Sequence, residues 1–84
     1  STLDIAGIVK EIVGRRYLVV EVKSAFHPGD ELEILIPGKR TLTVKPGEIR
    51  NAAGEPVERT NPNQIVLIRH CKSVVPGSII RIKK

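Results

Sequence analysis

Apolar and polar residues alternate over several short stretches of the chain. Between Tyr17 and Lys23, the residues Leu18, Val20 and Val22 fall on one side of an extended chain, and Glu31–Ile36 has a similar pattern. A period of two is typical of β-strands that bury one face. We therefore expect these stretches to be strands of a sheet with a buried inner side.

The same criteria predict further strands along the chain. We expect strands at Ile5–Val13, Tyr17–Lys23, Glu31–Ile36, Arg40–Lys45, Gln64–His70 and Ser78–Lys83, with a short edge strand at Glu55–Arg59 that contains Pro56. The run Ile65–Ile68 does not alternate, which predicts burial on both faces. Glu48–Arg50 is so short that we expect no more than one helical turn there. Gly7, inside the first strand, predicts a bulge or a close approach of the backbone.

Pro-Gly pairs separate many of these stretches. They occur at Pro28-Gly29, Pro37-Gly38, Pro46-Gly47 and Pro76-Gly77. Proline presets the φ of the first turn position, and glycine accepts the positive φ that the next one can need. Short strands between turns, without a long helix, predict an all-β fold. We expect a small antiparallel β-barrel of six to seven short strands, because closure removes unpaired edges.

The length of the chain allows one domain over residues 1–84. A domain of this size buries roughly 60% of its unfolded surface, which leaves little room for a deep active site beside the core. The longest apolar runs are far shorter than a membrane span requires, so we expect no membrane partner. The chain has no methionine, even at position 1, so we expect it to be part of a longer protein. Its single cysteine, Cys71, favours a reducing cytoplasm.

Basic residues exceed acidic ones by 14 to 9, which makes the net charge +5. Such a charge favours anionic partners such as nucleic acid, although solvated strand faces and turns would have the same composition. The longest basic runs are pairs, and they are the candidate contacts with an anionic partner: Arg15, Arg16, Lys39, Arg40, Lys83 and Lys84.

Few residues offer catalytic chemistry. His70 and Cys71 are adjacent, but neighbours on a strand point to opposite faces, so they are poorly placed to act as a base and a nucleophile. His27 lacks the further ligands that a structural metal needs, and Asp30 after Gly29 is expected to bond turn amides. We therefore predict no catalytic, cofactor-binding or metal-binding residue in this chain.

A longer combination of motifs resembles a known family. The run from Phe26 to Ile34, FHPGDELEI, resembles the F-x-x-G-D-x-L-E element in the C-terminal domain of the U32 peptidases, the collagenase-like proteases. Other elements follow the family in order: Ala6–Val9 before a hairpin, Pro37-Gly38 before Thr41–Val44, then Gly54–Glu58, an Asn-Pro turn before Ile65–Ile68, and Gly77–Arg81. The resemblance covers nearly the whole chain.

This resemblance implies a small β-barrel appended to a larger catalytic domain, which would hold the catalytic residues. We therefore expect a non-catalytic accessory domain that assists substrate binding, positioning or protein–protein interaction. Its expected partners are the catalytic domain of the parent chain and a macromolecular substrate, either protein or RNA. The alternative is an RNA-binding barrel of a relative that acts in RNA hydroxylation, whose cations would contact phosphates in a salt-dependent way.

Overall fold

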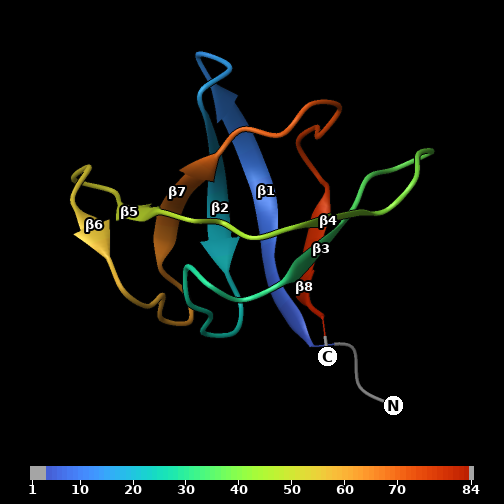
Figure 1. Cartoon of the computed structure of the whole chain (residues 1–84). Helices are drawn as coiled ribbons and strands as arrows, with labels where there is room; N and C mark the ends of the chain where they lie inside the picture. The colour runs from blue at the N-terminus through green and yellow to red at the C-terminus, as the bar shows by residue number, and fades with distance from the viewer. Residues whose placement is uncertain (1–3, 84) are drawn as a thin grey trace.

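The computed structural model describes residues 4–83, which form one curled antiparallel sheet (Figure 1). The order of the strands across the sheet is β4-β3-β8-β1-β2-β7-β5-β6. In chain order the strands are β1 (Ile5–Val13), β2 (Tyr17–Val22), β3 (Leu32–Leu35), β4 (Leu42–Val44), β5 (Ile49–Asn51), β6 (Pro56–Val57), β7 (Ile65–Arg69) and β8 (Ile79–Ile82).

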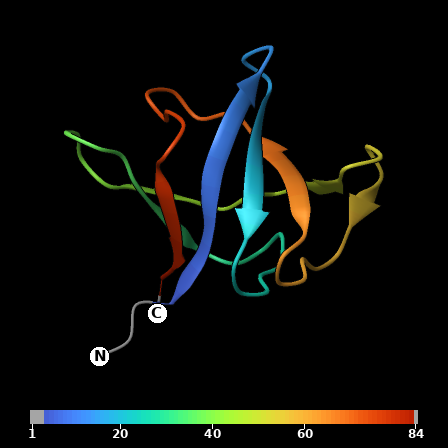
Figure 2. The same ribbon diagram turned by 180° about the vertical axis from the view of Figure 1, so that it is seen from behind.

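The two sides of the sheet are joined by the chain itself. Strands β4 and β5 follow one another in sequence but lie at opposite sides of the sheet order. The connection between them, residues 45–48, crosses the open side of the curled sheet, as both views show (Figures 1 and 2). The amide of Gly47 donates to the carbonyl of Pro28 at 3.0 Å, which ties this crossing to the β2–β3 connection. The barrel is thus closed by a crossing segment rather than by a continuous ladder.

The longest strand, β1, lies at the centre of the sheet and pairs with both β2 and β8. Its register slips between Ile5 and Gly7 on the β8 side. A Cβ atom on Gly7 would lie 2.6 Å from Val20 Cγ1 and 2.8 Å from the carbonyl oxygen of Glu21. Both predictions for Gly7, the bulge and the close backbone approach, are confirmed. The absence of a side chain is what lets β1 lie so near β2 at this point.

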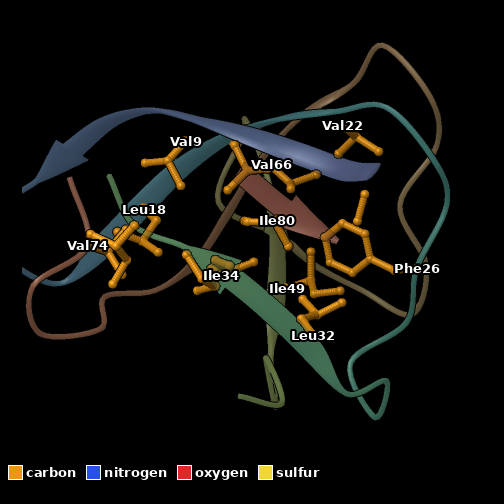
Figure 3. Close-up of a cluster of buried hydrophobic side chains, with 14 residues drawn as sticks. Val9, Leu18, Val22, Phe26, Leu32, Ile34, Ile49, Val66, Val74 and Ile80 are labelled. Carbon is orange, nitrogen blue, oxygen red and sulfur yellow. The ribbon is translucent and has the colours of Figure 1, made fainter. Parts of the chain in front are cut away.

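The core fills the inside of the curl (Figure 3). Leu18, Val20 and Val22 of β2 are fully buried, as their alternation predicts. Phe26, also fully buried, covers one end of the core from the β2–β3 connection. The other buried apolar residues are Ala6, Val9, Leu32, Ile34, Ile36, Ile49, Val66, Ile68, Val74 and Ile80. Leu42 and Val44 of β4 are partly buried and pack against this cluster.

The all-β barrel-like fold is confirmed, with two corrections of detail. Ile49–Asn51 is a strand, not the helical turn expected for Glu48–Arg50, which brings the described strands to eight. It pairs with both β6 and β7, and Ile49 is fully buried. In β7 the expected burial of both faces is wrong: Val66 and Ile68 are buried, whereas Ile65 on the outer face is 41% exposed. This sheet has a single covered side, so a four-residue apolar run still places two residues outward.

The described chain contains no helix that is long and apolar enough to cross a membrane.

Candidate functional site

Three connections emerge together at one end of the barrel. Strands β1, β3 and β7 run in the same direction, because each is antiparallel to a strand shared with its neighbour. The segments that follow them, residues 14–16, 36–41 and 70–78, therefore leave the sheet at the same end. In both views the 70–78 segment lies between the other two (Figures 1 and 2).

Most of the predicted anionic contacts lie at this end. Arg15 and Arg16 occupy the β1–β2 turn, and Lys39 and Arg40 occupy the β3–β4 turn. The end also includes two cations that were not among the sequence candidates. We call this surface the basic end and define it by Arg15, Arg16, Lys39, Arg40, Arg69 and Lys72.

The third predicted basic pair does not belong to this surface. Lys83 follows β8 at the opposite end of the barrel, where its Nζ lies 3.8 Å from Glu31 Oε1. Lys84 lies outside the described residues. The structure thus brings together two of the three pairs and separates Lys83 from them.

The six cations of the basic end have no carboxylate partner within residues 4–83. The ion pairs among these residues involve other cations: Arg50 with Glu48 beside the basic end, and elsewhere Lys10 and Lys23 with Glu21 and Arg81 with Glu33. The charge of a cation without an ion-pair partner is not offset by a neighbouring carboxylate, so it attracts an external anion more strongly than a paired cation does. The basic end is therefore a surface with six cations and no ion pair of its own among residues 4–83.

A cavity of about 430 Å³ opens at one side of the basic end. Its lining is strongly polar and consists of Arg15, Arg16, Tyr17, Pro46, Glu48, Arg50, Arg69 and His70. We call it the arginine cavity. Tyr17 and Arg69 are cross-strand partners of β2 and β7, and the amide of His70 donates to the carbonyl of Arg16 at 2.9 Å. These backbone contacts hold the β1–β2 turn against the end of β7.

One arginine of this cavity is already satisfied. Arg50 makes a two-bond contact with the Glu48 carboxylate, from Nε at 3.1 Å and from Nη2 at 3.2 Å. Its Nη1 also donates to the carbonyl of Gly54 at 2.6 Å. Glu48 thus neutralises Arg50. The net positive charge of the cavity comes from Arg15, Arg16 and Arg69, with the Arg16 guanidinium 6.0 Å from the centre of the Tyr17 ring.

A second hollow of about 270 Å³ lies between the β3–β4 turn and the 70–78 segment. Ile36 and Leu42 form its apolar floor, and Lys39, Arg40, Lys72 and Ser73 complete the lining. We call it the apolar hollow. Ile36 is 5% exposed, so its side chain forms part of the core as well as this floor. The hollow can take an aliphatic group with cations around it.

His70 and Cys71 do not have the features of a catalytic pair. The Cys71 thiol donates weakly to the carbonyl of Arg69 at 3.6 Å. Burial raises the pKa of this thiol, and the nearby Arg69 guanidinium opposes that rise only in part. A raised pKa leaves less thiolate at neutral pH, whereas a nucleophilic cysteine needs a lowered one. Cys71 has the chemistry of a packed structural thiol, and it lies partly buried against the core.

The segment at His27 and Asp30 forms a capped turn. Asp30 Oδ2 accepts a hydrogen bond from the His27 amide at 2.8 Å, and the Asp30 amide donates to the His27 carbonyl at 3.1 Å. The predicted turn role of Asp30 is confirmed. Among residues 4–83, no three His, Cys, Asp or Glu side chains gather in an arrangement that could hold a metal ion.

Sequence reasoning missed Arg69 and Lys72 as parts of the basic end, and Arg50 and His70 as parts of the arginine cavity. Arg50 and Arg69 are isolated basic residues in their own stretches, so a search for basic pairs overlooks them. The available sequence signal is that Arg69 and Lys72 lie around the end of the predicted strand Gln64–His70. Pairing of β2 with β7 places this end beside the Arg15-Arg16 turn.

Comparison with known proteins agrees with the fold and the motifs. Residues 1–81 match the sequence model of the Peptidase family U32 C-terminal domain. A crystal structure of the C-terminal domain of a Geobacillus thermoleovorans protein assigned to the U32 peptidases is 24% identical, with a TM-score of 0.86 over 96% of this chain and 93% of that one. The selenomethionine variant of that domain is 25% identical, with a TM-score of 0.83 over 92% and 96% of the two chains.

No protein with a curated function matches the sequence significantly. Nothing in these similarities supports the RNA-binding alternative. The family match extends over the motifs of the Phe26–Ile34 run and over all eight strands except the end of β8. The chain therefore belongs to the family of U32 peptidase C-terminal domains, as the sequence resemblance predicted.

Proposed function

We propose that this domain is a non-catalytic accessory module of a U32 peptidase, in which it helps to bind or position a macromolecular substrate. The observation that carries the proposal is the concentration of binding capacity at one end of an otherwise complete barrel. Six cations without a carboxylate partner among residues 4–83, the arginine cavity and the apolar hollow all lie at the basic end. Such a surface can hold a ligand, but its groups do not form a nucleophile–base pair.

In this proposal the catalytic residues belong to another domain of the same parent protein, a cytoplasmic hydrolase. The accessory domain raises the local concentration of substrate near the catalytic domain, because a substrate held by one of two linked sites binds the other intramolecularly. The fold suits this role, since the three basic connections follow strands β1, β3 and β7, which are paired within one sheet.

Comparing the full parent protein with a truncated form that lacks this domain tests the proposal. We expect truncation to raise KM for gelatin and other protein substrates, with kcat for a short peptide unchanged. An interaction that holds the substrate equally well before and during the reaction lowers KM and leaves kcat unchanged, so its loss raises KM only. The isolated domain should hydrolyse neither gelatin nor peptides. Hydrolysis by a clean preparation of the domain, or truncation without any effect on KM, would contradict the proposal.

A further inference from the structure

We propose that the basic end binds an acidic, extended polypeptide segment that carries an aliphatic residue among its carboxylates. This inference deepens the accessory role and rests on it, since it names the substrate feature that the domain holds. It combines the arginine cavity with the neighbouring apolar hollow, which line the same end of the barrel.

The arginine cavity supplies the electrostatic part. Arg15, Arg16 and Arg69 have no carboxylate partner among residues 4–83, whereas Arg50 is already paired with Glu48. Guanidinium groups match carboxylates in a planar, two-bond geometry, as Arg50 and Glu48 themselves illustrate. Three unpaired guanidinium groups around one cavity are therefore suited to more than one carboxylate of an incoming segment.

The apolar hollow supplies the second part. Its apolar lining consists of Ile36, which is buried, and Leu42, which is half-buried, beside a hollow of about 270 Å³. The surrounding Lys39, Arg40 and Lys72 attract carboxylates next to the group that fills the hollow. A leucine-sized side chain in this hollow would lose part of its contact with water, which favours binding. A basic cavity and an apolar hollow at the same end of the barrel thus suit a ligand with both acidic and aliphatic groups.

Two further exposed apolar residues lie at the same end. Val13, the last residue of β1, is 49% exposed, and Val75, in the 70–78 segment, is 41% exposed. Protein interfaces combine apolar contacts with arginine in this way. These exposed valines extend the apolar surface at the end that also holds the unpaired arginines.

A nucleic acid fits this surface less well. Proteins that bind single strands combine basic grooves with aromatic side chains on which the bases stack. Tyr17 and Phe26 are the only aromatic residues of the chain, and Phe26 is fully buried. A phosphate backbone would also leave the Ile36–Leu42 floor uncovered. The single available ring and the apolar floor both favour a polypeptide over a nucleic acid.

Fluorescence anisotropy with a defined probe tests the proposal. The probe is a fluorescein-labelled peptide in which two leucines are each flanked by pairs of glutamates. Two double variants of the chain remove charge at the basic end: Arg16→Gln with Arg69→Gln, and Lys39→Gln with Lys72→Gln. The matched control, Arg59→Gln with Lys83→Gln, removes the same charge from the opposite end. All four positions of the test variants are exposed, and thermal unfolding verifies that each variant keeps its fold.

We expect each basic-end double variant to lower the affinity for the peptide about fivefold, which is the effect expected when two exposed ion pairs are lost. The control should change affinity less than twofold. Replacing the leucines of the peptide by serine should weaken binding about tenfold, because the apolar hollow then stays unfilled. Equal effects of the control and test variants, or no effect of the leucines, would overturn the proposal.

Two further outcomes are decisive. An oligothymidylate of equal charge that displaces the peptide at lower concentration would assign the basic end to nucleic acid and overturn the polypeptide proposal. Introducing both basic-end double variants into the parent protein separates this inference from the proposed function. If removing the whole domain raises KM but these substitutions do not, the accessory role stands and the assigned surface is wrong.

Discussion

Phe26 and Thr60 exchange two hydrogen bonds across 34 residues of sequence. The amide of Phe26 donates to Thr60 Oγ1 at 2.9 Å, and the amide of Thr60 donates to the carbonyl of Phe26 at 2.9 Å. Both residues are fully buried. The pair joins the β2–β3 connection to the segment before β7, and so closes the end of the barrel opposite the basic end.

Replacing Thr60 by valine should destabilise the domain by about 1–3 kcal/mol. Valine has nearly the same shape but no acceptor, so the buried amide of Phe26 would lose its partner and pay its full desolvation penalty. Urea unfolding followed by circular dichroism measures the change. Thr60→Ser keeps the hydroxyl and serves as the control, with a smaller loss. A valine variant as stable as the wild type would show that this hydrogen bond does not stabilise the fold.

Replacing Gly7 by alanine should cost about 2 kcal/mol or more. The new methyl would lie 2.8 Å from the Glu21 carbonyl oxygen, a backbone atom that can move only by disturbing the β1–β2 ladder. Gly29→Ala is the matched control, because no atom lies within 4 Å of a Cβ at that position. We expect the control to change the thermal midpoint little. Equal midpoints for the two variants would refute the close approach of β1 and β2.

The contact between Arg81 and Glu33 should give a measurable but small coupling energy. Arg81 Nε lies 2.7 Å from Glu33 Oε1, and the two residues are direct cross-strand partners of β8 and β3. A double-mutant cycle with Glu33→Gln and Arg81→Gln should give about 0.5 kcal/mol, decreasing in 1 M salt. The ion pair between Lys83 Nζ and Glu31 Oε1 provides the comparison, because its distance of 3.8 Å is longer and it should give a coupling energy near zero. A larger coupling for that second pair would contradict this ranking.

The Cys71 thiol should make stability decrease at alkaline pH. Its pKa is raised in the folded state, chiefly by burial, so the folded chain holds the thiol proton more tightly than the unfolded chain. The associated stability is fully present below the ordinary thiol pKa of about 9.0 and is lost as the pH rises through the higher folded value. Urea unfolding at a series of pH values should therefore show a steeper alkaline decrease for wild type than for Cys71→Ser. Identical slopes would mean that the thiol titrates alike in both states.

The same raised pKa predicts slow alkylation of Cys71. At pH 8, iodoacetamide should modify it more slowly in the folded domain than in urea, because the thiolate is the reacting form. Mass spectrometry of timed samples follows the reaction. Faster modification of the folded domain would indicate an activated cysteine and would reopen a catalytic role for it.

The β1–β2 hairpin shows how far local sequence signals reach. The strand β2 and its buried face follow from alternation, and the turn before it contains Gly14, which has a φ of 57°. The Asp30 turn is equally local, since its hydrogen bonds span three residues. Features of this kind depend on neighbours along the chain, and the sequence contains them directly.

Strand β5 illustrates what local signals cannot predict. Ile49–Asn51 is too short to show a period, and it becomes a strand because Ile49 pairs with Ile68 and fills the core. The outward position of Ile65 has a similar origin, since it depends on which face of β7 the rest of the barrel covers. Both properties arise from contacts with distant segments.

The sequence by itself determined every strand except β5, the Pro-Gly turns, the family and the presence of paired basic residues. Only the tertiary structure decided that Arg15-Arg16 and Lys39-Arg40 share one end with Arg69 and Lys72, while Lys83 lies at the other. The physical reason is that alternation and turn geometry are set by adjacent residues, whereas the end at which a turn emerges depends on strand order and direction. Strand order is a property of pairing between distant segments, and the closing segment 45–48 completes it.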